Sequence, residues 1–192
     1  MMIPDRDKLT PAGAIKDIAV MIACVFFLLY FRVGIISGNS MEPTLGDGGV
    51  VVYSSTTSEL RRGDIVVFTA PDGGALIKRI VGLPGDVISI KGGVVTLNGE
   101  RLEEGYTAPG LYADGDMDYP CNIPSGHYFV MGDNRPHSRD SRMQCVGLVS
   151  DGQILGVVRC VVTPSHKRHV TRHVTRRILG HFQKIAKNEQ KN

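Results

Sequence analysis

Apolar residues follow three different patterns along this chain. A run of fourteen uncharged residues covers positions 18–31, and residues 33–36 continue it beyond Arg32. From residue 47 to about residue 163, short β-branched runs alternate with Gly, Pro, Asp and Asn. In residues 166–192, apolar side chains recur every three or four positions among many basic ones. These patterns predict an apolar N-terminal helix, a β-rich domain and a basic C-terminal tail.

Residues 18–36 are long enough for a transmembrane anchor. Nineteen residues at about 1.5 Å each reach about 28 Å, close to a hydrocarbon core of about 30 Å, provided that Arg32 extends its guanidinium to the interface. A cleaved signal peptide is the alternative, but no small-x-small site follows the run. Basic residues precede it, which favours a cytoplasmic location for residues 1–17. We therefore expect a single-pass anchor in the lipid bilayer, with residues 37–165 as an extracytoplasmic domain.

The central domain is expected to be mainly β, as an antiparallel sandwich or partly closed barrel. Gly92 and Gly93 can supply the positive φ angles of a tight turn, so residues 90–100 are predicted to form a hairpin. The runs that predict strands cover residues 49–53, 64–70, 75–81, 87–90, 94–100, 127–131 and 154–162.

The basic tail dominates the charge of the 192-residue chain. Residues 166–192 hold eight Lys or Arg and one Glu, a net +7, so the remaining residues sum to −4 within the total of +3. The periodicity predicts an amphipathic helix with a basic face, for which anionic lipid is a candidate partner; a solvated tail is the alternative. Because the predicted topology places the tail outside the cytoplasm, we expect no nucleic acid as a partner.

The four cysteines carry no metal-binding pattern. Cys24, Cys121, Cys145 and Cys160 lack CxxC spacing and have no paired histidines nearby, so no metal and no other cofactor is expected. Cys121 and Cys145 flank the polar segment 132–142 and are candidates for a disulfide in an oxidising compartment, which would leave Cys160 buried.

A candidate nucleophile lies directly after the apolar segment, in the block SGNSMEPTL at residues 37–45. Ser40 follows Gly38 by two positions and precedes Pro43, whose fixed φ stiffens the turn. Such a turn can present a hydroxyl and a backbone N–H to the same point. The simpler interpretation is that Ser40 caps a short helical turn.

A serine nucleophile needs a proton acceptor, and Lys78 is the strongest candidate. It lies in the apolar run ALIKRIV, where burial would lower its pKa towards neutrality. Arg79 cannot act as a base, because guanidinium keeps its proton. Strand alternation places Lys78 and Arg79 on opposite faces without indicating which face holds the site. A snorkelling edge-strand lysine is the alternative for Lys78, and His137 remains an alternative base.

The blocks SGNSMEPTL, RRGDIVVF (61–68), KRIVGLPGD (78–86) and GDNRPHSRDSR (132–142) occur in the order seen in bacterial type I signal peptidases, which this chain resembles over about residues 18–163. Members are membrane-anchored Ser-Lys proteases of the secretory pathway, in the cytoplasmic membrane with an outer catalytic domain. The resemblance implies that Ser40 is the nucleophile and Lys78 the general base. It also implies that Ser138 orients Lys78 and that Asp140 and Arg142 form a supporting ion pair.

The implied reaction is cleavage of signal peptides from exported preproteins at small-x-small sites. The N–H of Ser40 would hold the oxyanion. Some members place a serine hydroxyl two residues before the nucleophile, where this chain has Gly38, so the second donor is open.

Three alternatives remain at this stage. The first is a dedicated Ser-Lys peptidase for one pilin or conjugation substrate, the second a self-cleaving repressor on the same β scaffold, and the third a membrane-tethered binding module.

Overall fold

The computed structural model describes residues 11–55 and 59–162. The basic tail, residues 166–192, lies outside the described residues. In chain order the elements are α1 (Pro11–Tyr30), β1 (Phe31–Ile35), β2 (Val50–Ser54), β3 (Ile65–Thr69), β4 (Ala75–Gly82), β5 (Val87–Lys91), β6 (Val94–Leu97), β7 (Glu100–Arg101), β8 (Cys121–Asn122), β9 (His127–Met131), η1 (Arg135–His137), β10 (Val149–Ser150), η2 (Asp151–Gln153) and β11 (Ile154–Val162).

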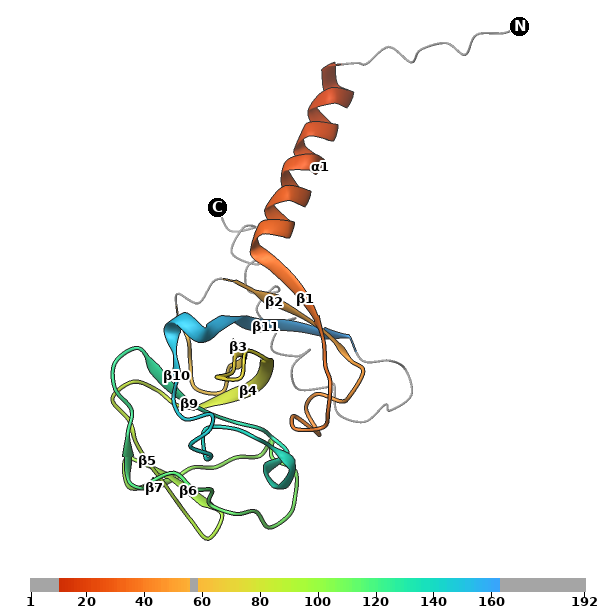
Figure 1. The fold of residues 1–192 in the computed structure, drawn as a ribbon. Coiled ribbons are helices and arrows are strands. Elements are labelled where there is room, and N and C mark those ends of the chain that lie inside the picture. Colours follow the sequence, from red (N-terminus) through yellow and green to blue (C-terminus); the bar gives the residue numbers. More distant parts are fainter. Residues whose placement is uncertain (1–10, 56–58, 163–192) are drawn as a thin grey trace, which may run out of the picture.

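Seven strands form the larger sheet, in the order β1-β2-β11-β3-β4-β9-β10, with antiparallel pairing throughout. The last strand, β11, lies between β2 and β3 (Figure 1), so the C-terminal strand of the domain pairs with two strands from its N-terminal half. Its β-branched residues favour this position, and Val157 packs in the same core cluster as Val66 and Phe68 of β3. The sheet places β4 between β3 and β9, where a strand is covered by neighbours on both edges.

Four short strands form a second antiparallel sheet, in the order β7-β6-β5-β8. Gly92 and Gly93 connect β5 to β6 with φ angles of 59° and 76°, and Lys91 pairs with Val94. Two successive positive φ angles are those of a type I′ turn, so the predicted hairpin is confirmed. This sheet lies at the end of the domain away from α1 (Figure 1).

The expectation of a mainly β, antiparallel domain is confirmed, since each of the seven predicted runs contributes a strand. No closed barrel forms among the described residues, because both sheets end in edge strands. Four strands were not anticipated: β1, β7, β8 and β10. The last three have two residues each, too few for an alternating pattern to register.

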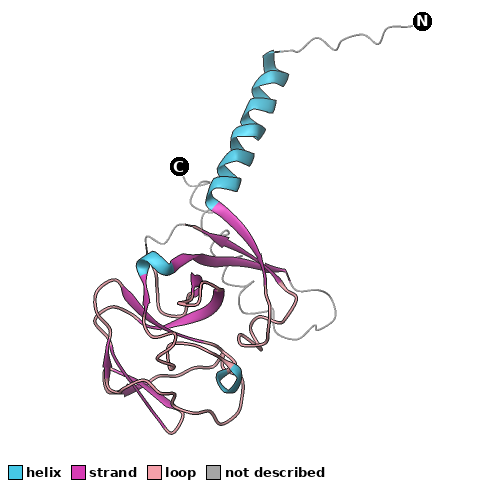
Figure 2. Ribbon diagram, in the orientation of Figure 1, coloured by secondary structure: helices cyan, strands magenta, loops and turns pink. Residues whose placement is uncertain are grey.

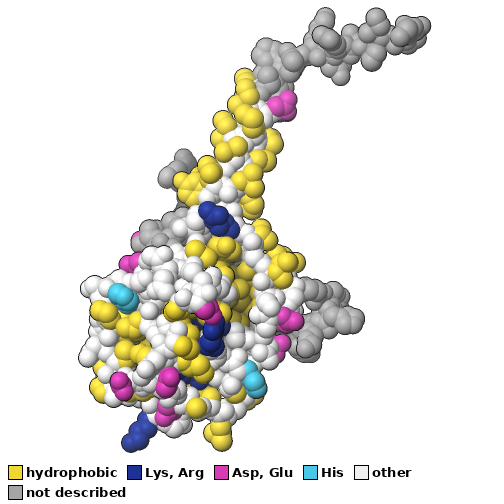
Figure 3. Space-filling view, in the orientation of Figure 1, with side chains coloured by type: hydrophobic (Ala, Val, Ile, Leu, Met, Phe, Trp, Pro, Cys, Tyr) yellow, Lys and Arg dark blue, Asp and Glu magenta, His cyan; other side chains and the backbone are white. Residues whose placement is uncertain are grey.

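The N-terminal segment differs from the expected anchor over residues 18–36. The helix α1 ends at Tyr30, and β1 follows at once, with Val33 opposite Val52 of β2 (Figure 2). Apolar side chains cover the visible face of α1, and Leu28 and Leu29 are 74% and 66% exposed (Figure 3). Among the helices of the described residues, none reaches both the length and the apolarity that a bilayer crossing requires. The transmembrane helix is therefore not confirmed.

The cysteines also differ from expectation. All four are free, so no disulfide joins Cys121 to Cys145. Cys160 was expected to be buried but is exposed. It follows a register shift in the pairing of β11 with β2, between Val158 and Cys160, and the shift disturbs the inward and outward alternation on which burial depends.

The close approach of β11 to β2 depends on Gly156. A Cβ built there would lie 2.2 Å from the carbonyl oxygen of Ser54 and 2.8 Å from Cδ2 of Tyr53. We predict that Gly156→Ala lowers the free energy of unfolding by about 1–3 kcal/mol, because backbone must shift to make room. Denaturant unfolding measures this change. Gly152→Ala is the matched control, since a Cβ at Gly152 meets nothing within 4 Å; equal stability of the two variants would contradict the packing described.

Candidate active site

Lys78 lies near the middle of β4 and is buried, with 2% of its surface exposed. Its Nζ donates hydrogen bonds to Ser40 Oγ at 2.7 Å and to the Ile77 carbonyl at 2.9 Å. Burial lowers the pKa of Lys78 to about 8, because an ammonium loses more hydration than an amine does. The strand therefore presents, in contact with the candidate nucleophile, a lysine whose pKa is close enough to neutrality for about a tenth of it to be neutral at pH 7.

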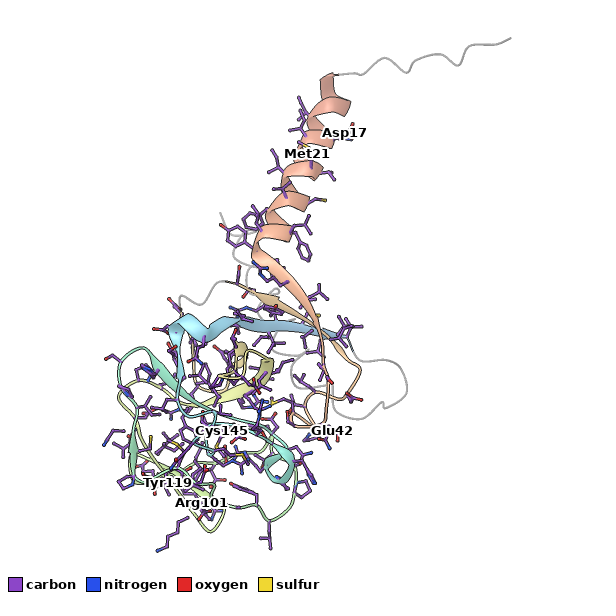
Figure 4. All side chains as sticks on the ribbon, viewed as in Figure 1. Asp17, Met21, Glu42, Arg101, Tyr119 and Cys145 are labelled. Carbon is purple, nitrogen blue, oxygen red and sulfur yellow. The ribbon has the colours of Figure 1, made fainter. Side chains whose placement is uncertain are left out.

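Ser40 lies in the turn between β1 and β2, and local contacts hold this turn. Gly38 adopts φ +94°, and its N–H donates to Asp47 Oδ1 at 2.7 Å. Glu42, which marks the turn in Figure 4, donates its N–H to the Asn39 carbonyl at 3.0 Å. Met41, at 2% exposure, anchors the turn in an apolar cluster. The serine side chain itself remains half-buried.

The turn after β9 is bonded to the turn that carries Ser40. The N–H of Asn134 donates to the Ser40 carbonyl at 3.0 Å, and Asn134 Nδ2 donates to the Asn39 carbonyl at 3.0 Å. These two bonds fix the backbone on both sides of the Ser40 N–H. This N–H is the candidate oxyanion donor, so Asn134 helps to set the direction in which the donor points.

A buried ion pair joins three chain segments beneath the site. Arg79, next to Lys78, donates from Nε to Asp133 Oδ1 at 2.8 Å and from Nη2 to Oδ2 at 2.5 Å. Thr44 Oγ1 donates to Asp133 Oδ2 at 2.5 Å, and Arg79 Nη1 donates to the Gly63 carbonyl at 2.8 Å. We call Arg79, Asp133 and Thr44 the hub, because they connect the serine turn, the lysine strand and the turn after β9.

The ion pair between Asp140 and Arg142 is present and buried. Arg142 Nε lies 2.8 Å from Asp140 Oδ1, and Nη2 lies 2.9 Å from Oδ2. Asp140 Oδ2 also accepts the Gly132 N–H at 2.9 Å, while Arg142 Nη2 donates to the Arg135 carbonyl at 2.8 Å. The pair thus closes residues 132–142 into a compact turn.

Ser138 lies beside the site, but it does not bond to Lys78. Its hydroxyl is buried and is the one such side-chain atom in the described residues without a hydrogen-bond partner. A Cβ at Gly132 would lie 2.1 Å from Ser138 Oγ and 2.5 Å from the Ser40 carbonyl. Gly132 therefore lets Ser138 and Ser40 approach each other. The hydrogen bond from Ser138 to Lys78 that the motif implies is not formed in this structure.

His137, the alternative base, is bonded to Asn134 and makes no hydrogen bond to Ser40. Its side chain is exposed, and Nδ1 is 3.2 Å from Asn134 Oδ1. The structure therefore brings Ser40 together with Lys78, and it brings Asp140 together with Arg142.

Sequence reasoning missed the hub and the segment that covers it. Thr44 was part of the serine block but carried no assigned role, and Arg79 was considered only as a base. Tyr106 and Glu104, which lie against the hub and the adjoining turn, belong to residues 91–125, where no block resembled the family. The signal available was Asp133, an acidic residue in a rigid turn that needs a cation if it is buried.

A family model described as signal peptidase, peptidase S26, matches residues 12–163. Signal peptidase I of Bacillus licheniformis is 36% identical over 159 residues, which cover 77% of this chain and 84% of the relative. Signal peptidase I T of Bacillus subtilis strain 168 is 34% identical over 167 residues, which cover 81% and 86%. A crystal structure of a signal peptidase I from Enterococcus faecalis V583 matches with 30% identity and a TM-score of 0.45, over 53% of this chain and 98% of that one.

We predict that Lys78→Met stabilises the fold at pH 7. A pKa lowered from 10.5 to about 8 means that burial of the ammonium costs about 3 kcal/mol at pH 7, and a methionine of similar size avoids that cost. The unfolded chain binds more protons between pH 8 and 10.5, so wild-type stability rises over this range and the advantage of the variant shrinks.

Denaturant unfolding of both proteins at pH 7, 9 and 10.5 tests this prediction, with a gain of about 1–3 kcal/mol expected at pH 7. Lys91→Met, at an exposed position in β5, is the control and should change stability by less than about 0.5 kcal/mol. A constant difference between the Lys78 variant and the wild type over the whole range would show that Lys78 is not a buried titrating group.

A second prediction compares a buried ion pair with an exposed one. Asp133→Ala leaves the Arg79 guanidinium buried without its carboxylate and should lower the free energy of unfolding by about 3–5 kcal/mol. Asp72→Ala removes the partner of Arg139, where both side chains are about half exposed, and should cost less than about 1 kcal/mol. Urea denaturation of the two variants distinguishes them; similar losses would contradict the role of the hub.

Proposed function

The chain belongs to the signal peptidase family, peptidase S26, and on this premise we propose that Ser40 and Lys78 are the dyad with which it cleaves signal peptides from exported preproteins. The resemblance inferred from the four sequence blocks is confirmed, and the protein is a peptidase. The 2.7 Å contact between Lys78 Nζ and Ser40 Oγ is the observation that carries the assignment of the dyad.

In the acylation step, neutral Lys78 takes the proton from Ser40 Oγ as the oxygen attacks the carbonyl carbon of the scissile peptide. The carbonyl oxygen becomes an oxyanion, which the Ser40 N–H stabilises. The Gly38 N–H is engaged by Asp47, so we do not assign it to the oxyanion. Collapse of the tetrahedral intermediate breaks the C–N bond, and the lysine ammonium gives its proton to the leaving amine.

Deacylation uses the same groups in reverse order. Lys78, neutral again, takes a proton from water, the resulting hydroxide adds to the acyl carbon, and the ammonium returns the proton to Ser40 Oγ as the ester bond breaks. The base must lose its proton before each half-reaction. Burial of Lys78, which lowers its pKa, is therefore a requirement of the reaction.

Signal peptidases I are membrane-associated, with an extracytoplasmic catalytic domain. We propose that α1 is the membrane-attached segment of this chain and that its N-terminus lies on the cytoplasmic side. The support is the exposed apolar surface of α1, where Phe26 and Leu28 are 55% and 74% exposed, since large exposed apolar surfaces mark sites of contact with membranes or other proteins. Because β1 follows α1 without a break and β1 leads to the Ser40 turn, attachment there would hold the site near the lipid.

The test of the dyad is cleavage of a preprotein with an Ala-x-Ala site, in detergent, with the cut identified by mass. We predict that Ser40→Ala and Lys78→Met each lower kcat/KM by at least about 1,000-fold, because the first removes the proposed nucleophile and the second the proposed general base. Ser125→Ala and Lys91→Met, at exposed positions, are the matched controls and should keep wild-type rates. In the wild type, kcat/KM should fall about tenfold for each pH unit below about 8, as Lys78 becomes protonated.

Cleavage that survives Lys78→Met would overturn the dyad and direct attention to His137. Cleavage of one substrate among many unrelated preproteins would favour the dedicated peptidase of the earlier alternatives. If the wild type cleaves nothing and a serine-directed phosphonate does not label Ser40, the result would favour the membrane-tethered binding module.

A further inference from the structure

The segment between β7 and β8, residues 102–120, lies over the turn after β9, and we call it the bridging loop. Its backbone is bonded to that turn: the Ala108 N–H donates to the Asp133 carbonyl at 2.9 Å, and the Asp116 and Met117 N–H groups both approach the Arg142 carbonyl at 3.1 Å. A Cβ at Gly115 would lie 2.1 Å from the same Arg142 oxygen. The loop therefore packs closely against the segment that holds the site together.

Tyr106 of the bridging loop covers the hub. Its ring centroid lies 4.1 Å from Cζ of Arg79, which is cation–π geometry. The guanidinium thus has Asp133 at its edge, the Gly63 carbonyl at Nη1 and the Tyr106 ring on its face. The Arg79 side chain is 11% exposed in this enclosure. Removal of the ring would open the hub to water from the side of the bridging loop.

Glu104 ties Tyr106 to the turn after β9. It accepts the Tyr106 hydroxyl at 2.8 Å and receives Arg135 through both terminal nitrogens, with Nη1 at 2.8 Å. Arg135, at 2% exposure, also donates from Nε to the Gly132 carbonyl at 2.9 Å. Burial and the adjacent Glu104 carboxylate raise the pKa of Tyr106, so the phenol stays protonated and remains a donor.

Three arginines of the site region face tyrosines of this one loop. Besides Tyr106 over Arg79, Tyr112 lies 5.6 Å from Cζ of Arg135 and 5.1 Å from Cζ of Arg142. A loop that only joined two strands of the small sheet would not need to place aromatic rings on guanidinium groups of β4 and of the turn after β9.

We propose that the bridging loop is a positioning element of the peptidase site. Tyr106 and Glu104 hold Arg79 and Arg135 in place, and this keeps Lys78 and the turn after β9 in the positions that the reaction requires. This inference rests on the proposed Ser-Lys dyad and adds positioning residues to it. Tyr106 acts through Arg79, which is adjacent to Lys78 in β4, and Glu104 acts through Arg135.

The position of Arg79 affects the charge balance at Lys78. Carboxylates favour the charged form of the lysine and guanidinium groups disfavour it, and the charged groups that face Lys78 are Asp140, Arg139, Asp133 and Arg142. If Arg79 turns into water, Asp133 is less neutralised and water approaches the lysine. Both changes raise the pKa of Lys78, and the acidic limb of the rate profile moves to higher pH.

The experiment is the pH dependence of kcat/KM for preprotein cleavage by the full-length chain carrying Tyr106→Ala, at a temperature where each variant is folded. The acidic limb should move up by about one pH unit, with about a tenfold lower kcat/KM at pH 7. Tyr106→Phe keeps the ring, so its limb should coincide with that of the wild type. If Tyr106→Ala does not fold, Tyr106→Leu replaces it, since leucine fills much of the space without offering a π face.

Tyr119→Ala is the matched control. Tyr119 belongs to the same loop and packs against the core of the small sheet, in the lobe where Figure 4 labels it, with its hydroxyl donating to the Asp114 carbonyl at 3.2 Å. It should lower the melting temperature without moving the limb. A Tyr106→Ala or Tyr106→Leu profile that changes only as the Tyr119→Ala profile does would overturn the proposal.

Failure of the proposal can be separated from failure of the dyad. If the wild type shows lysine-dependent cleavage and the Tyr106 variants keep the wild-type limb, the dyad stands and the positioning role is wrong. If Lys78→Met cleaves as the wild type does, the dyad fails. In that case NMR titration of the Lys78 ε-methylene in wild type and Tyr106→Ala still measures the coupling, and equal midpoints would contradict it.

Discussion

The site depends on keeping the Lys78 amine out of water. A lysine that is 2% exposed requires acceptors for its donors and neighbours that exclude solvent, and burial then lowers its pKa to about 8. The next residue, Arg79, meets the opposite requirement, because guanidinium stays charged and needs a carboxylate. Two adjacent cations on one strand are thus buried in different ways: one by partial loss of its charge, the other by pairing with Asp133. The surrounding structure supplies both environments.

Sheet topology brings the two side chains of the proposed dyad together from distant parts of the chain. Ser40 lies in the turn that connects β1 to β2, whereas Lys78 lies in β4, between β3 and β9. Lys78, the proposed base, is in a strand with neighbours on both edges, while Ser40, the proposed nucleophile, lies on a turn that needs external support. Asn134 supplies this support to the backbone, and the hub supplies it through Thr44. Asn134 and the Asp133 carboxylate of the hub both belong to the turn after β9, so this turn is the element on which the relative position of the proposed dyad rests.

Much of the strand content, and the two side chains that meet at the candidate site, could be predicted, because each left a local pattern. β-branched runs between glycines and prolines became strands, and Lys78 stood out as a cation in an apolar run. The strand β1 could not be anticipated, because an apolar run reads equally well as a helix until β2 is available to pair with it. The face of β4 that meets Ser40 could not be read from the alternation of Lys78 and Arg79, because it is set by contacts across 38 positions. The contacts of Glu104 and Tyr106 were hidden because irregular loops carry no periodic signal.

Several buried charges lie within this one region, in the pairs Arg79–Asp133, Arg135–Glu104 and Arg142–Asp140. Replacing such pairs by apolar side chains often leaves stability unchanged or raises it, so stability alone does not explain why they stand here. Their geometry offers a reason, since each arginine donates in fixed directions to backbone carbonyls: Arg79 to Gly63, Arg135 to Gly132 and Arg142 to Arg135. Apolar packing has no comparable directionality. A turn that positions the proposed nucleophile must be held to within a fraction of an ångström. Directional hydrogen bonds can fix its backbone to that precision, whereas a purely apolar core would leave the backbone freer to shift.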